Sequence, residues 1–492
     1  MSKRKEIVSQ VWVYLVGTIL SQGLTLAAAV LTRRFLGPVQ MGVWALLQVV
    51  LKYSSYTTLG TTAAVSREIP FHAGRQDRER VERIQDTYFT YGVLSSMVLA
   101  ALLALGAALL RGRLDPVIVW GLVWTGALLV LQRFNNVLIT LLRAHKQFEI
   151  ASKQMVVSSV VNAVCITVLS YRFEVYGYIW GMGLSYLFNT LYILWAARPR
   201  LRWGWDAAEF RGLAGYGAPL LAIGLMNTAF MSIDRFMIAG MLGLREVGLY
   251  GMAAMAASYA ANAPNAVSVV LLPRFHEKYG REGRAQDLRG YTARSAEVFA
   301  DLMPFLIGAG WCFAPWGVAR LLPDFTPGVA ALKLLVVGSY FLAVTHPYNT
   351  FLIAIKRHWA LVPLLAALCL AALAVNAWVL RSGYGIEGVA IAAAVVLAMR
   401  FVSHLALAAR YSGQGAGMGR ECLLIALKFA VMTALLWALD SWVPLSRSTL
   451  AGASLRYAIL CAVYTPVLVR FVREYGLWEA IRRKAGSARA GA

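Results

Sequence analysis

The sequence is poor in charged residues, and above all in acidic ones. Only 14% of its 492 residues are charged, and 24 Asp and Glu stand against 47 Lys and Arg. Hydrophobic residues make up 59% of the chain. A soluble domain carries about 25% charged residues, and no soluble core buries this much apolar surface. The composition therefore excludes a soluble globular protein and predicts that lipid surrounds much of the chain.

Cysteine is also scarce, and several catalytic motifs are missing. The five cysteines stand singly inside apolar runs, without the spacing of a metal site, so we expect small buried hydrophobic residues. The chain lacks a Gly-x-x-x-x-Gly-Lys-Ser/Thr loop and a His-Glu-x-x-His motif. No Asp-x-Asp pair lies in a predicted outer loop. These absences argue against direct use of ATP and against an enzyme, and we expect neither a cofactor nor a metal.

Apolar runs of helical length recur along the whole chain. Each is long enough to cross a hydrocarbon layer of about 30 Å at about 1.5 Å per residue. The first run follows three basic residues, but it is too long for a signal peptide and many similar runs come after it. We predict fourteen transmembrane helices, over residues 8–32, 41–65, 88–110, 116–141, 154–172, 176–196, 214–240, 246–272, 294–320, 328–353, 360–380, 387–409, 421–440 and 452–470.

The basic residues of the loops indicate the orientation of these helices. With the N-terminus inside, the predicted inner segments hold roughly three times as many Lys and Arg as the outer ones. Both termini are then cytoplasmic. The largest extramembrane pieces are the inner loops 66–87 and 273–294 and the C-terminal tail. The net charge of +23 therefore reflects topology and anionic lipid, and we expect no nucleic-acid partner.

A short sequence motif occurs twice, 206 residues apart. FLGPVQMGVW begins at Phe35 and MLGLREVGLY begins at Met241, and both place two glycines and an aromatic residue at the same spacing. Both follow an odd-numbered predicted helix and lead into the next. An offset of six helices preserves orientation, which is typical of parallel repeats. Ala73-Gly74-Arg75 and Tyr279-Gly280-Arg281 match at the same offset. Glycine at these positions permits a tight turn or a close helix approach.

The repeat defines the predicted domains. The fold class is an all-α polytopic membrane protein with two pseudo-symmetric six-helix lobes and an appended helix pair. The lobes cover residues 1–206 and 207–410, the appended pair covers 411–473, and a cytoplasmic tail covers 474–492.

Several stretches resemble a known family. They are RRFLGPVQMGVWALLQ from Arg33, LGTTAAVSRE from Leu59, LLRAHKQFEIASKQ from Leu141 and SIDRFMIAGMLGLREVGLYGMAA from Ser232. They are similar to bacterial lipid-linked oligosaccharide flippases, the polysaccharide-transporter branch of the multidrug/oligosaccharidyl-lipid/polysaccharide exporter superfamily. The resemblance implies a two-lobed transporter in the bacterial or archaeal cytoplasmic membrane, whose central cavity opens alternately to the two sides. It also implies a polyprenyl-diphosphate-linked sugar as cargo, with the appended helices forming part of a groove for the lipid tail.

Ionisable residues inside the predicted helices are candidates for a binding site, because a charge in the membrane faces a cavity or a partner. Lys52 and Arg400 lie deepest, and Arg133 lies about eight residues from the inner end of its predicted helix. A cavity role competes with helix-to-helix pairing for each of them. Asp234 and Arg235 are adjacent, so they point about 100° apart and each needs its own partner. A third set, comprising Lys333, Lys428 and Arg456, lies nearer to helix ends, and we expect these side chains to snorkel to the interface.

Polar residues accompany these charges. Gln48 and Lys52 belong to a polar stripe at helical period in the second predicted helix, and Asn135 lies near Arg133. Asn262 precedes a proline, where its amide either contacts a sugar or satisfies a kinked backbone. The predicted substrate-binding residues are therefore Lys52, Arg133, Asp234, Arg235, Arg400, Gln48, Asn135 and Asn262.

An excess of buried Arg and Lys suits an anionic cargo such as a diphosphate. We expect the chain to carry a lipid-linked oligosaccharide from the inner to the outer leaflet for cell-surface polysaccharide assembly. Membrane lipids and glycan polymerase or glycosyltransferase machinery are the expected partners. The alternative is a cation-coupled multidrug or organic-ion antiporter on the same fold, for which deep carboxylates would be needed.

Overall fold

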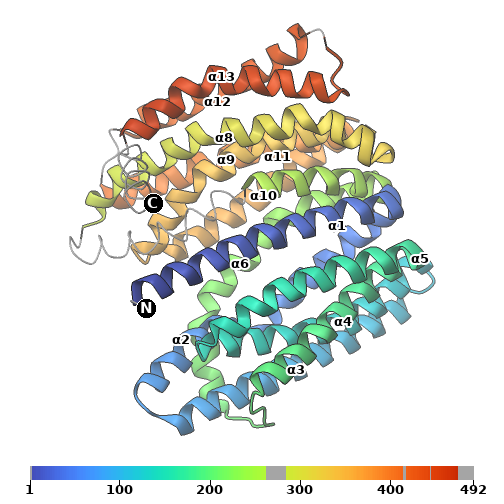
Figure 1. Ribbon diagram of the computed structural model, residues 1–492, viewed down its shortest axis with the longest axis vertical. Coiled ribbons are helices and arrows are strands. Elements are labelled where there is room, and N and C mark those ends of the chain that lie inside the picture. The colour runs from blue at the N-terminus through green and yellow to red at the C-terminus, as the bar shows by residue number, and fades with distance from the viewer. Residues whose placement is uncertain (1–2, 262–283, 414–416, 444, 475–492) are drawn as a thin grey trace, which may run out of the picture. The chain divides into compact units, whose positions relative to one another are not determined.

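The computed structural model describes residues 3–261, 284–413, 417–443 and 445–474. These residues are almost entirely helical, and no strand occurs among them. The helices form two compact units, Met1–Gly248 and Leu249–Ala492. Figure 1 shows the helices of each unit as long, roughly aligned rods.

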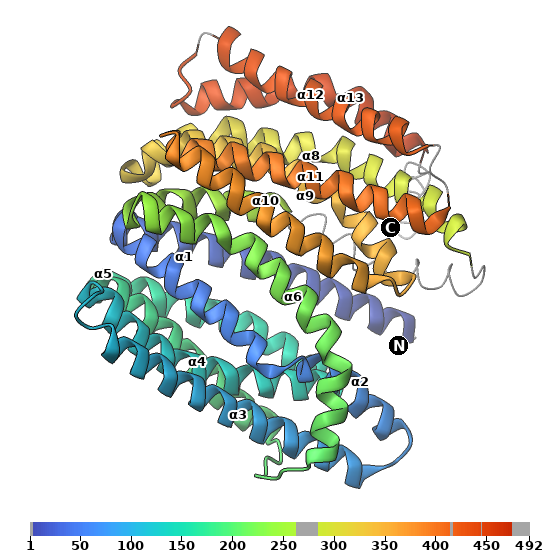
Figure 2. The ribbon, with the colours of Figure 1, turned by 180° about the vertical axis from the view of Figure 1, so that it is seen from behind.

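The first unit contains six helices and a short 3₁₀ turn. They are α1 (Lys3–Ser54), η1 (Ser55–Thr58), α2 (Thr61–Gly74), α3 (Arg78–Leu109), α4 (Pro116–Ala144), α5 (Phe148–Ala197) and α6 (Ala207–Met241). Residues 244–261 are also helical and cross the boundary between the units. In both ribbon views α3, α4 and α5 run side by side (Figures 1 and 2).

Two of these helices are interrupted. α1 contains Gly37 at φ 70°, ψ 177°, and α5 contains Glu174 at φ 55°, ψ −135°. Each residue leaves the helical conformation, so each long element consists of two helical segments. Gln40 joins the two breaks, because its Nε2 donates to Glu174 Oε2 at 2.5 Å and its Oε1 accepts from the Val175 N–H at 3.0 Å. α1 packs along α5 over much of its length.

The helix predicted over residues 41–65 does not run through. α1 ends at Ser54, and the chain turns through η1 to Leu59 and Gly60, which both have left-handed backbone (φ 48° and 76°). The predicted inner loop 66–87 is mostly helical, since α2 and α3 occupy all but three of its residues. The apolar pattern marks the membrane-buried part of a helix, and these helices continue beyond it.

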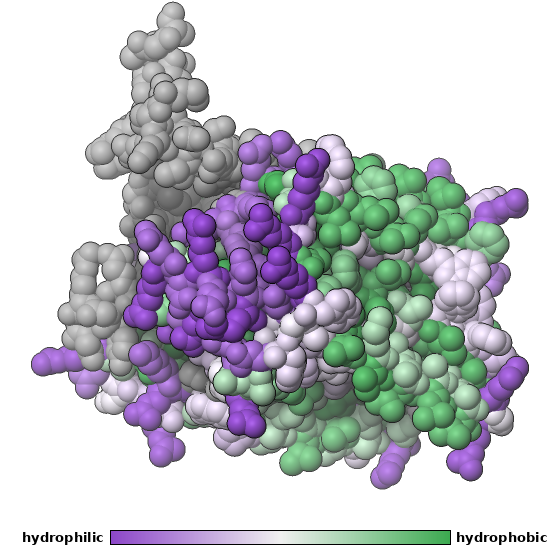
Figure 3. Space-filling view, turned by 90° about the horizontal axis from the view of Figure 1, so that it is seen from below, coloured by the Kyte–Doolittle hydropathy of each residue, from purple (hydrophilic) through white to green (hydrophobic). Residues whose placement is uncertain are grey.

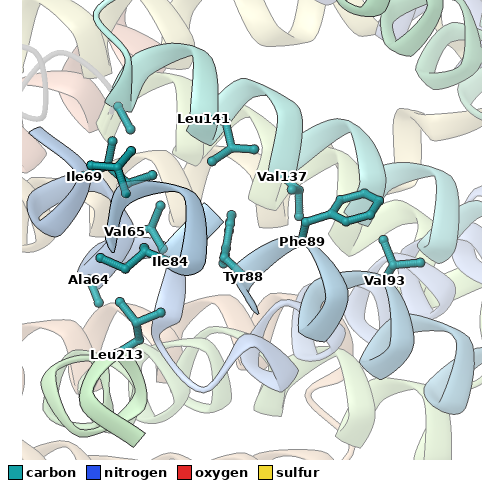
Figure 4. Packing of buried hydrophobic residues seen from close by; sticks show 12 residues of the cluster. Ala64, Val65, Ile69, Ile84, Tyr88, Phe89, Val93, Val137, Leu141 and Leu213 are labelled. Atoms are coloured by element: carbon teal, nitrogen blue, oxygen red, sulfur yellow. The ribbon is translucent and has the colours of Figure 1, made fainter. Parts of the chain in front are cut away.

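Glycines allow α2 to approach α6 closely. A Cβ atom on Gly60 would overlap the backbone of Gly217, and a Cβ atom on Gly217 would overlap the backbone of Gly60. Neither position therefore has room for a side chain. A cluster of buried apolar residues then joins α2, α3 and α4 (Figure 4). Its members include Val65, Ile84 and Val137, with Leu213 contributed by α6. This packing fixes the end of the unit at which α1 breaks.

The second unit has six described helices and two short 3₁₀ turns. They are α8 (Ala285–Leu321), η2 (Pro323–Gly328), α9 (Val329–Ala354), η3 (His358–Ala360), α10 (Leu361–Arg381), α11 (Gly385–Ser412), α12 (Met418–Trp442) and α13 (Leu450–Glu474). α9 packs between α8 and α11 and is the most buried of them. α12 and α13 both pack on α8. The C-terminal tail and part of the loop 273–294 lie outside the described residues.

The chain is a multi-pass membrane protein. Eleven described helices are long and apolar enough to cross a membrane. Large apolar side chains lie exposed on them, and Figure 3 shows apolar residues covering a broad part of one face, with hydrophilic residues gathered beside them. The prediction of an all-α polytopic membrane protein is confirmed. The count of fourteen, the six-helix lobes and the cytoplasmic termini stay predictions.

Candidate functional site

The first unit contains a polar cavity of about 380 Å³ among its membrane-spanning helices. We call it the cationic pocket. It is lined by Trp44, Gln48, Leu51 and Lys52 of α1, Ser55 and Tyr56 of η1, Gln132 of α4, Met182 and Tyr186 of α5, and Thr228 of α6. None of these residues is acidic.

The sequence places the α1 residues on one face. Trp44, Gln48 and Lys52 follow one another at spacings of four, so a single face of α1 presents them, and Ser55 comes three residues later in η1. α1 then breaks, and η1 carries Tyr56 across to α6. The Tyr56 hydroxyl donates to the Gly224 carbonyl at 2.7 Å and lies 2.5 Å from Thr228 Oγ1. These bonds hold the broken end of α1 against α6.

Two cations meet at this pocket. Arg235 of α6 is half-buried, and its Nη1 donates a long hydrogen bond, 3.5 Å, to Gln48 Oε1. Lys52 lies within electrostatic range of Arg235, and its ammonium group makes no ion pair in the part of the chain that the structure describes. Asp234 is half-buried beside Arg235 on α6. The structure thus brings together Gln48, Lys52 and Arg235, which come from two helices far apart in the sequence.

Arg133 lies behind the pocket and not in its lining. Its side chain is buried in α4, and its Nη2 donates to the Ser54 carbonyl at 2.6 Å and to Thr57 Oγ1 at 3.0 Å. Ser54 ends α1, where carbonyl groups have no partner within the helix. Arg133 therefore satisfies the broken end of α1 and complements its negative dipole end.

Asn135 also serves a helix contact. It is 2% exposed, and its Nδ2 donates to Thr190 Oγ1 of α5 at 3.3 Å. Gln132, which is not among the predicted substrate-binding residues, is the α4 amide that lines the cationic pocket, where it donates to the Tyr186 hydroxyl at 3.2 Å. The side of a helix that faces a cavity depends on its neighbours, which sequence spacing alone does not define.

Arg400 lies in the second unit. It is buried on α11 within electrostatic range of His346 of α9 and Cys369 of α10. His404, one turn later, donates from Nδ1 to the Arg400 carbonyl at 2.8 Å. Asn262 lies outside the described residues. Among the described residues, no three His, Cys, Asp or Glu are placed to hold a metal ion.

The expectation that Lys333, Lys428 and Arg456 snorkel to the interface is wrong. Lys333 Nζ lies 2.5 Å from Asp440 Oδ2, and Lys428 Nζ lies 2.7 Å from Asp301 Oδ1. Arg456 is 2% exposed, and it donates from Nε to the Leu439 carbonyl at 3.2 Å and from Nη2 to the Val443 carbonyl at 3.1 Å, at the end of α12. Intramembrane charges here are satisfied by partners on adjacent helices.

Sequence reasoning missed the acids that α12 contributes. Glu421 accepts from Arg289 Nη2 of α8 at 3.3 Å and from the Tyr348 hydroxyl of α9, and Asp440 pairs with Lys333. A signal was present, because Glu421, Ile425, Lys428, Met432, Leu436 and Asp440 recur at three- to four-residue spacing. That period places the charges on the same face as the buried apolar residues.

Comparisons with known proteins agree with this architecture. A family model described as polysaccharide biosynthesis protein matches residues 30–315. The inward-facing conformation of a multidrug resistance MATE family transporter of the MOP superfamily superposes with a TM-score of 0.68 at 16% identity, covering 84% of this chain and 96% of that one. Lipid II flippase MurJ in its inward closed conformation gives a TM-score of 0.68 at 13% identity, covering 93% and 99%.

A Vibrio cholerae MATE transporter, VcmN in the bent form, gives a TM-score of 0.55 at 17% identity, covering 86% of this chain and 98% of that one. No curated protein sequence matches the chain. At these identities the structural likenesses establish the fold alone.

Proposed function

Because the chain belongs to the polysaccharide biosynthesis protein family, we propose that it is a flippase for a polyprenyl-diphosphate-linked oligosaccharide. The cargo moves from the inner to the outer leaflet of the cytoplasmic membrane, for assembly of a cell-surface polysaccharide. The observation that carries this proposal is the cationic pocket, where Lys52 and Arg235 meet beside a cavity that no acidic residue lines.

The chemistry of this pocket favours an anion. Two like charges held close together in membrane-spanning helices repel each other, and a bound diphosphate relieves that repulsion. The planar fork of Arg235 suits phosphate oxygens, while Lys52 acts as a point charge. Gln48 orients Arg235 without neutralising it. The polyprenyl tail stays in lipid throughout, so the helices must handle only the headgroup.

Alternating exposure of this pocket to the two sides is the proposed mechanism, and no covalent step is involved, so the protein is not proposed to be an enzyme. The breaks at Gly37 and Glu174 and the helix over residues 244–261 support fourteen spans in a twelve-plus-two layout with both termini inside. Polymerases or glycosyltransferases of the same glycan are the proposed partners. The alternative antiporter of organic cations is disfavoured, because a cation would meet two positive charges here.

Reconstituted protein tests the proposal directly. Proteoliposomes loaded with a fluorescently labelled polyprenyl-diphosphate-linked oligosaccharide report flipping as the label becomes accessible to an external quencher. Lys52→Gln and Arg235→Gln are each expected to slow flipping about tenfold, equivalent to about 1.4 kcal/mol. Lys153→Gln is the matched control, because Lys153 pairs with Glu149 on an exposed surface away from the pocket. Wild-type rates in the double variant Lys52→Gln/Arg235→Gln would refute the proposal.

A further inference from the structure

A second cavity of about 230 Å³ lies in the first unit, between the first segment of α1 and α5. We call it the hydroxyl pocket. It is lined by Thr25, Ala28, Ala29, Thr32, Ser158, Ser159, Asn162, Ala163, Ile166, Tyr178 and Met182. No charged residue is among them, and the flippase proposal makes no use of this cavity.

The hydroxyl pocket adjoins the cationic pocket. Met182 of α5 lines both cavities. Trp44 lines the cationic pocket and Tyr178 lines the hydroxyl pocket, and their ring centroids are 4.5 Å apart. A ligand with an anionic group in one cavity can therefore place the neighbouring part of the same molecule in the other.

The polar groups of the hydroxyl pocket include both acceptors and donors. Thr25, Thr32 and Ser159 each donate their hydroxyl proton to a carbonyl one turn earlier in their own helix, at 2.7–2.8 Å. Thr25 keeps oxygen lone pairs with which to accept. Thr32 is fully buried, Ser159 Oγ also contacts Ser21 Oγ, and Ser158 Oγ accepts from Asn189 Nδ2 at 3.0 Å, which leaves the Ser158 hydroxyl proton to donate. The Asn162 amide makes no hydrogen bond among the described residues, and it is half-buried, so it offers two donors and an acceptor.

This pattern suits a ring that carries several hydroxyl groups. Sugar hydroxyls donate to acceptors and also accept from an amide, and the cavity has room for a single sugar ring rather than a chain of them. A carboxylate is poorly suited, because no cation lines the pocket to offset the cost of its desolvation.

We propose that the hydroxyl pocket is the subsite for the first, uncharged sugar attached to the diphosphate. The proposal rests on the proposed function, since the cationic pocket must hold the diphosphate for the sugar to reach Asn162. It predicts that this protein selects its cargo partly by the charge and hydroxyl pattern of the sugar at the reducing end. Uronic acids at that position are expected to be rejected.

Binding measurements on the purified full-length protein separate the two claims. The probes are farnesyl diphosphate and its glucosyl, galactosyl, N-acetylglucosaminyl and glucuronosyl derivatives. The wild-type protein is expected to bind farnesyl diphosphate, and to bind at least one neutral-sugar derivative about tenfold more tightly. The glucuronosyl derivative is expected to show no such gain. Asn162→Ala should abolish the gain while leaving the affinity for farnesyl diphosphate unchanged.

The affinity for farnesyl diphosphate also reports that each variant is folded. Asn136→Ala, which removes an exposed amide from α4, is the matched control and should bind every probe as the wild type does. The subsite is overturned if no neutral sugar improves binding, or if the gain survives in both Asn162→Ala and Ser158→Ala. If the wild-type protein binds none of the probes, the diphosphate site and the proposed function fail together.

Discussion

Gly42 and Gly248 pack backbone against backbone, and each makes the same contact with the other's segment. A Cβ atom on Gly42 would overlap the Leu244 carbonyl, and one on Gly248 would overlap the Pro38 carbonyl. Leu244 follows Pro38 by 206 residues, which is also the separation of the two glycines. The contact is therefore reciprocal in the way that a two-fold axis produces. Gly37 and Gly243, at φ 70° and 100°, make the turns that lead into it.

We predict that Gly42→Ala and Gly248→Ala each destabilise the protein by about 1–3 kcal/mol, because rigid backbone atoms occupy the space for the new methyl group. Thermal unfolding in detergent measures the effect. Gly106→Ala is the control, since nothing lies within 4 Å of the position that its Cβ would take. Equal unfolding temperatures for all three variants would mean that the two segments do not approach this closely.

Gln48 gives a sharper test of the cationic pocket than the removal of either charge. Gln48→Glu places a carboxylate beside Arg235, so the new ion pair should cancel the charge that attracts a diphosphate. Affinity for farnesyl diphosphate is expected to fall by tenfold or more, and by less in Gln48→Ala. Isothermal titration measures both. A carboxylate without effect would show that the anion does not bind at Arg235.

Arg133 is expected to support the pocket without touching the cargo. Arg133→Gln leaves the Ser54 carbonyl without its charged donor, which costs about 1–3 kcal/mol of stability. Flipping should slow, while the affinity for farnesyl diphosphate changes far less than in Lys52→Gln. Arg133→Lys should restore part of the stability, since it keeps a cation at the end of α1. A loss of affinity equal to that of Lys52→Gln would instead make Arg133 a ligand.

The charged residues around Asp440 in the second unit are expected to contribute unequally to stability. Asp440 lies within 4 Å of Lys333, Arg447 and Arg456, so Asp440→Ala leaves several cations without their shared partner. We predict a loss of about 3–5 kcal/mol for this variant. Lys333→Met should cost less, because Asp440 keeps two cations and the methionine still packs on Trp311, over which Lys333 lies. Unfolding temperatures compare the two, and a larger loss in Lys333→Met would contradict the prediction.

Much of the fold could be predicted from the sequence, because a helix that crosses the hydrocarbon layer needs a long run of apolar residues. α4 begins at Pro116 as expected, with Asp115 capping it. The start of α3 at Arg78 was missed by ten residues, since a helix stays helical beyond the membrane while its composition turns polar.

The site was predicted only in part. Gln48, Lys52 and Arg235 meet because α6 packs across α1, and the polar stripe of α1 indicated one side of that contact. Arg133 is also a basic residue within a predicted helix, yet its side chain faces the broken end of α1. Whether a buried arginine faces a cavity or the end of a helix depends on where the adjacent helix ends, and the polar pattern of the sequence does not show that α1 ends at Ser54. The partner of Lys333 was equally hidden, since Asp440 lies 107 residues away at the edge of another helix.

The hydrogen bonds of Gln40 at the break in α5 limit how the cationic pocket can change shape. Gln40 is bonded to both Glu174 and Val175, so the breaks in α1 and α5 are held together and the two helices should move as one unit. α4 is joined to α5 by the hydrogen bonds of Asn135 and Gln132, so it belongs to the same unit. Three walls of the pocket are thereby rigid with respect to one another. α6, which supplies Thr228, is joined to this group at η1, where the Tyr56 hydroxyl bonds to Gly224 and Thr228, so a change in the shape of the pocket has to involve that contact.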